Sequence, residues 1–105
     1  MNLSVAERYT LLSLLPQEGT FTTLKVVRKL REALSFSEQE ISDFKIKETQ
    51  TPNGVVAQWD ASAASAEISI GEVATDLIVN ALKKLNESGK LTDREFSLYE
   101  KFVEK

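Results

Sequence analysis

The sequence of 105 residues contains no histidine and no cysteine, and these two absences exclude many kinds of chemistry. Histidine is the only side chain whose unperturbed pKa lies between about pH 5 and 8, and cysteine is the most nucleophilic side chain at neutral pH. Ser-His and Cys-His catalysis, thiolate redox chemistry, Cys/His zinc sites and His-ligated haem or copper are therefore excluded. The remaining carboxylates, lysines, hydroxyls and two tyrosines indicate no reaction. We expect a protein that is not an enzyme and holds no cofactor.

Glycine and proline are scarce, with four and two residues. The glycines are single and widely spaced, which excludes a Gly-rich phosphate-binding loop. No apolar run approaches the roughly 18 residues that a membrane span needs. The first residues, Met1 to Ser4, lack the basic stretch and apolar run of a signal peptide, and the lack of cysteine fits a reducing compartment. We expect a soluble, cytoplasmic protein.

The composition is that of an ordinary globular protein, with 42% hydrophobic and 28% charged residues. Its length predicts a single compact domain over residues 1–105. The helices and strands predicted below make this an α+β domain. The net charge is −3, and it is unevenly distributed. Basic and acidic groups balance in residues 1–52, whereas residues 53–105 carry six basic and nine acidic groups. The sign and size of this charge argue against a dedicated DNA-binding protein.

Three Ser/Thr-x-x-Glu patterns predict helix starts, because each can form a reciprocal capping box. The pairs are Ser4 with Glu7, Ser37 with Glu40, and Thr92 with Glu95. Pro16 ends the first helix, and a second helix begins at Thr20 or Thr22. The longest helix follows Gly71 and ends at Gly89.

Between the third and fourth helices, the hydrophobic pattern alternates as in a strand. Phe44 and Ile46 alternate with lysines, as on a half-buried strand. Asn53-Gly54 predicts a tight hairpin turn, because Asn-Gly readily adopts positive φ. The next strand has an inward face made of Val55, Ala57 and Trp59.

A loop of small and polar residues over 60–66 precedes a third strand over 67–70. The element order is therefore α-α-α-β-β-β-α-α. We predict an α+β fold with a small three-stranded antiparallel sheet, formed by the hairpin and one further strand. N- and C-terminal helix pairs flank this sheet.

The second helix carries a basic face. Its basic residues are Lys25, Arg28, Lys29 and Arg31, with Glu32 as the one acid nearby. Lys25, Arg28 and Lys29 share a face, because residues three and four apart are neighbours on a helix. Such a face binds a phosphate backbone or an acidic protein surface, or it is simply solvated. A helix-turn-helix is disfavoured, because the junction over 16–22 is longer than the turn of that motif.

Trp59 is the single tryptophan. It is either a core residue or an interface anchor, since tryptophan is enriched among binding hot spots. The hairpin edges can accept a strand from a partner or from a second copy of the chain. Val55 and Val56 in succession indicate that both sheet faces are covered, by helices or by the mate in a homodimer. The four basic residues and Trp59 are thus the candidate binding residues.

The acidic residues give no metal or catalytic site. Glu38, Glu40 and Asp43 lie close in sequence, but Glu40 belongs to a cap and first-turn acids are expected from the helix dipole. Glu72 and Asp76 are one helical turn apart at the start of a helix, where the two carboxylates could ligate a hard cation. Nothing else in the sequence completes a coordination shell, so we expect no metal.

Several segments resemble small uncharacterised proteins encoded by tailed phages and prophages. These segments are residues 3–8 (LSVAER), 14–19 (LLPQEG), 23–32 (TLKVVRKLRE), 83–85 (KKL), 91–92 (LT) and 98–102 (LYEKF). The resemblance implies no active site, but phage accessory proteins of this size often bind and block a host protein. We therefore expect a non-enzymatic protein-binding module, an accessory or inhibitory protein that acts on a host protein. The alternative is a nucleic-acid-associated regulator that uses the basic face.

Overall fold

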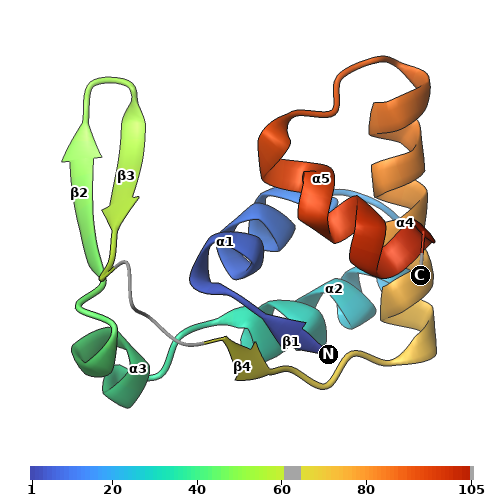
Figure 1. Ribbon diagram of the computed structural model, residues 1–105. Helices are drawn as coiled ribbons and strands as arrows, with labels where there is room; N and C mark the ends of the chain where they lie inside the picture. The colour runs from blue at the N-terminus through green and yellow to red at the C-terminus, as the bar shows by residue number, and fades with distance from the viewer. Residues whose placement is uncertain (61–64, 105) are drawn as a thin grey trace.

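The computed structural model describes residues 1–60 and 65–104. A helical body carries a β-hairpin that projects from it (Figure 1). The helices are α1 (Val5–Leu14), α2 (Phe21–Leu34), α3 (Glu38–Asp43), α4 (Glu72–Glu87), α5 (Asp93–Tyr99) and the π-helical turn η1 (Glu100–Glu104). The strands are β1 (Asn2–Leu3), β2 (Lys47–Thr51), β3 (Gly54–Gln58) and β4 (Ala66–Glu67). The predicted α+β class is confirmed. No helix in the described part of the chain has the length and apolar character needed to cross a membrane.

The three predicted capping boxes are confirmed, at the starts of α1, α3 and α5. At the first, the Glu7 N–H donates to Ser4 Oγ at 3.1 Å, and the Ser4 N–H donates to Glu7 Oε1 at 2.9 Å. Of the two predicted starts of the second helix, Thr20 is correct, because its hydroxyl caps the Thr23 N–H. Gly89 follows the C-cap of α4, Ser88, and has a φ of +68°, which a residue with a side chain rarely adopts.

The core lies among α1, α2, α4, α5 and η1. Its buried apolar members are Leu3, Leu11, Leu15, Val27, Leu30, Leu34, Ile68, Ala74, Ile78, Leu82, Leu98 and Phe102. The stripe Ala74, Ile78 and Leu82 recurs every fourth residue of α4, and this spacing brings all three side chains onto one face. Burying that face is the main reason why the helix forms.

The predicted three-stranded sheet is wrong. The structure has two separate two-stranded antiparallel sheets, β1 with β4 and β2 with β3. The third predicted strand, over 67–70, is shorter and lies at Ala66–Glu67, where it pairs with β1 in the register Leu3↔Ala66 and Asn2↔Glu67. The Ile68 N–H continues this pairing by donating to the Met1 carbonyl at 2.9 Å. Among the residues that the structure describes, the hairpin therefore receives no third strand.

The alternation of Phe44 and Ile46 does not form a strand. Phe44 caps the C-terminus of α3, and Lys45 has a φ of +54°, in the left-handed region. The Ile46 N–H then donates back to the Ile41 carbonyl at 3.0 Å, and the Ile46 side chain is buried. The first hairpin strand begins one residue later, at Lys47.

The hairpin turn is Pro52-Asn53, one residue earlier than the predicted Asn-Gly pair, since Thr51 pairs with Gly54. Proline fixes a negative φ at the first turn position, and the positive φ of +119° falls on Gly54. The predicted inward face is wrong for Val55, which is 59% exposed, whereas Ala57 and Trp59 are half-buried. Val56, on the opposite face, is 48% exposed. Residues 61–64 of the loop predicted over 60–66 lie outside the described residues.

The base of the hairpin is held by aromatic and polar contacts to α1. The Trp59 ring stacks on the Tyr9 ring with centroids 5.6 Å apart, and Tyr9 also packs on Phe36 at 5.0 Å. The Tyr9 hydroxyl donates to Glu48 Oε1 at 2.9 Å. Burial and this bond to a carboxylate raise the pKa of Tyr9 to about 12, so the phenol stays a donor at neutral pH.

Candidate protein-binding surfaces

Arg8 fixes the end of α2 and the start of α3 from a buried position on α1. Its side chain is 2% exposed, and its guanidinium donates to the backbone carbonyls of Leu34 at 3.1 Å and Ser35 at 2.6 Å. It also donates to both carboxylate oxygens of Glu40, at 2.6 and 3.3 Å, and lies 4.0 Å from the Phe36 ring centroid. Sequence reasoning assigned Glu40 only to a cap, and it missed this pair.

The Glu40 carboxylate therefore accepts hydrogen bonds both at the start of α3 and from Arg8 on α1. One of its oxygens accepts from the Ser37 N–H at 3.0 Å, while both face Arg8. The hydrogen bond from Arg8, followed by that from the Ser37 backbone, lowers the pKa of Glu40 despite partial burial. The pair fixes the position of the α2 C-terminus relative to α1 and α3.

Glu7, which directly precedes Arg8, connects α1 to α5 and η1. Its carboxylate accepts from Lys101 Nζ at 2.7 Å, Ser97 Oγ at 2.8 Å and the Ser4 N–H at 2.9 Å. Burial raises the pKa of Glu7, but these three hydrogen bonds outweigh it and the net pKa is lowered. The helices that frame α2 are thus held by specific contacts as well as by the core.

All four predicted basic residues of α2 are exposed: Lys25, Arg28, Lys29 and Arg31. None of them forms a salt bridge within residues 1–60 and 65–104. The opposite face of α2 buries Val27, Leu30 and Leu34. The charges are therefore not used to hold the fold.

Three of these four residues line two different grooves of α2. Arg28 and Arg31 line a groove of about 420 Å³ between α2 and the α1–α2 connection. We call this the α1–α2 groove, and its other lining residues are Pro16, Gln17, Leu24 and Val27. Lys29 lines a second hollow of about 290 Å³ between α2 and the start of α4. Lys25 lines neither groove.

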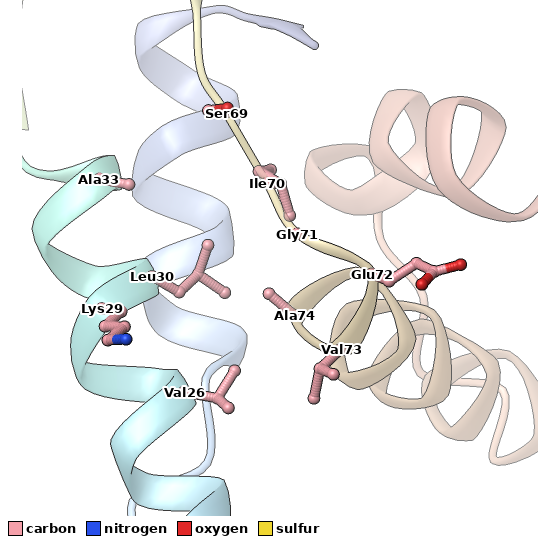
Figure 2. Close-up of a pocket in the computed structure, with 10 residues that line it drawn as sticks. All are labelled: Val26, Lys29, Leu30, Ala33, Ser69, Ile70, Gly71, Glu72, Val73 and Ala74. Atoms are coloured by element: carbon pink, nitrogen blue, oxygen red, sulfur yellow. The ribbon is translucent and has the colours of Figure 1, made fainter.

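Figure 2 shows this second hollow, with Val26, Leu30 and Ala33 of α2 facing Ala74 and its neighbours at the start of α4. The Glu72 side chain is directed away from α2. No carboxylate therefore neutralises Lys29 there, in agreement with the lack of a salt bridge between described residues.

The remaining candidates lie elsewhere. Trp59, on the Tyr9 ring, is half-buried and outside the core, and it lines neither groove of α2. Glu72 and Asp76 are exposed on α4, and no group of three or more potential metal ligands comes together in the described part of the chain. The exposed apolar side chains include Phe21 at 82% and Val73 at 61%, at the starts of α2 and α4.

Comparisons of the chain with protein-family models, with curated proteins and with solved structures find no match. A function for this chain has to be argued from its own surfaces. Two of these surfaces are not covered by any described residue and are suited to contact with a partner. They are the β2–β3 hairpin and the basic outer side of α2 with its adjoining grooves.

Proposed function

We propose that the protein is a non-enzymatic protein-binding module, an accessory or inhibitory protein that acts on a host protein, and that the β2–β3 hairpin meets the partner. The observation that carries this proposal is the exposure of Val55 and Val56 on opposite faces of a hairpin to which no other described segment adds a strand. Within residues 1–60 and 65–104, β2 and β3 pair only with each other, so no described strand occupies either outer edge of the hairpin.

Packing within the described part of the chain contributes little to the stability of this hairpin. A two-stranded hairpin alone is marginally stable in water, and neither of these valines is buried. Its base is nevertheless held by the Trp59 and Tyr9 rings and by the Asp60 N–H, which donates to the Phe44 carbonyl at 2.7 Å. A rigid base under an uncovered, β-branched hairpin is suited to a partner that adds a strand to an edge or packs on a face.

That the partner is a host protein is part of the proposal, and it follows from the expectation that several segments resemble small phage and prophage proteins. Proteins of that group and size often act by occupying a surface of a host protein. A short hairpin edge buries less than the roughly 1,200 Å² of a typical specific interface, so we expect the partner to cover a face as well as an edge.

The test compares the wild type with two hairpin variants and one control variant of the tagged protein, in pull-downs from nuclease-treated host lysate. Val55→Lys/Val56→Lys places charge on both hairpin faces, and Val55→Thr/Val56→Thr keeps the β-branched shape while removing apolar surface. Phe96→Lys is the matched control, because Phe96 is an exposed apolar residue of α5 that lies outside the hairpin and lines neither groove of α2. We expect the wild type and the control to retain a stoichiometric protein that both hairpin variants lose by about tenfold or more.

Two outcomes would contradict this proposal. One is capture that all variants retain, and the other is capture that disappears on nuclease treatment, which would favour the nucleic-acid alternative. Sedimentation velocity on the purified protein identifies a second copy as the partner if the wild type alone forms a dimer. Circular dichroism of each variant checks that the fold is intact.

A further inference from the structure

The α1–α2 groove combines an apolar floor with a strongly basic rim. Its floor is formed by Pro16, Leu24 and Val27, and its rim carries Arg28 and Arg31. No carboxylate is among its lining residues, and neither arginine forms a salt bridge with a described residue. Two guanidinium groups thus face one small apolar hollow without a counter-charge.

The surroundings increase this positive potential. Lys25 and Lys29 lie on the same exposed side of α2, where Glu32 is the one acid. The protein as a whole has a net charge of −3, so this region opposes the overall sign. Opposed signs of this kind orient a partner during encounter, because charged patches steer association.

We propose that the α1–α2 groove binds an acidic segment of another protein, with an apolar side chain on Leu24 and Val27 and carboxylates on Arg28 and Arg31. The planar guanidinium matches a carboxylate with two parallel hydrogen bonds. A hollow of about 420 Å³ has room for one or two side chains. This site is separate from the hairpin, and it does not depend on the function proposed above.

The apolar floor favours a peptide over a nucleic acid. A phosphate backbone gains nothing from contact with Leu24 and Val27, whereas a leucine or phenylalanine flanked by glutamates buries its side chain there. Phe21, which is 82% exposed at the start of the same helix, adds apolar surface beside the charges.

The experiment measures fluorescence anisotropy of labelled peptides with the full chain in about 0.15 M salt. The first peptide is Glu-Glu-Leu-Glu-Phe-Glu, and the second, Glu-Glu-Ser-Glu-Ser-Glu, has the same charge without apolar side chains. We expect the first to bind at least about tenfold more tightly than the second. Arg28→Glu/Arg31→Glu should weaken binding of the first peptide by about tenfold or more. Arg28→Gln/Arg31→Gln, which removes the two positive charges without reversing them, should also weaken its binding by about tenfold or more.

Lys83→Glu/Lys84→Glu is the matched control, because it changes the net charge equally at two exposed lysines of α4 that do not line the groove. It should bind the first peptide as the wild type does. Equal affinity for both peptides, equal weakening by the control, or preference for a labelled DNA duplex over the first peptide would each overturn the proposal. The hairpin variants should leave peptide binding unchanged, so this site and the hairpin can fail separately.

Discussion

Replacing Arg8 with methionine is expected to lower the free energy of unfolding by about 3–5 kcal/mol, the usual effect of breaking a buried ion pair from one side. The change leaves the Glu40 carboxylate and the carbonyls of Leu34 and Ser35 without the donor that they share. Urea denaturation, followed by the fluorescence of Trp59 and by circular dichroism, measures the loss. The transition should shift without a change in slope.

An exposed arginine provides the control for this prediction. Arg94→Met should change the free energy of unfolding by less than about 0.5 kcal/mol, because the Arg94 side chain is exposed and makes no salt bridge with a described residue. A double-mutant cycle with Glu40→Gln isolates the pairwise contribution. A loss of less than about 1 kcal/mol for Arg8→Met would show that the pair is not structurally important.

Acid is expected to destabilise the protein through Glu7 and Glu40. Both carboxyls have a pKa below their ordinary value of 4.5, Glu7 because its hydrogen bonds outweigh burial, and Glu40 because of Arg8. In the unfolded chain, each carboxyl binds its proton at a higher pH than in the folded protein. Their contribution to stability is therefore complete above pH 4.5 and is lost as the pH falls through the lowered values.

Urea denaturation at a series of pH values between about 7 and 2.5 tests this dependence. Glu7→Gln/Glu40→Gln should be less stable than the wild type at neutral pH, and its stability should fall less steeply below pH 4.5. Glu87→Gln/Glu104→Gln changes two exposed carboxyls, and it should follow the wild-type profile. Parallel profiles for the wild type and Glu7→Gln/Glu40→Gln would contradict the assignment.

Local signals in the sequence located the helices well, because a capping box is complete within four residues. The Ser4, Ser37 and Thr92 boxes needed no knowledge of the rest of the chain. The sheet was wrong because strand pairing is not local. The two-residue strands β1 and β4 pair across 63 or more positions, and neither is long enough to show an alternating pattern. Phe44 and Ile46 alternate by coincidence, since a helix ends between Ile41 and Lys45.

The basic side of α2 could be predicted because exposed charges need no partner within the chain. The grooves beside it could not, since they depend on how α1 and α4 pack against α2. Arg8 was overlooked although a signal exists: it precedes Leu11, Leu12 and Leu15 by three, four and seven positions. That spacing places its side chain on the apolar stripe of α1, where a charge requires a buried partner.

The two neighbouring charges on α1 acquire their partners at very different times as the chain is synthesised. Arg8 and Glu40 are 32 positions apart, whereas Glu7 and Lys101 are 94 apart. Residues up to 40 can complete the Arg8 pair, whereas the Glu7 carboxylate acquires two of its donors only when Ser97 and Lys101 pack on α1. We therefore expect the Glu7 contacts to form after the Arg8–Glu40 pair during folding, because closing a longer loop costs more conformational entropy.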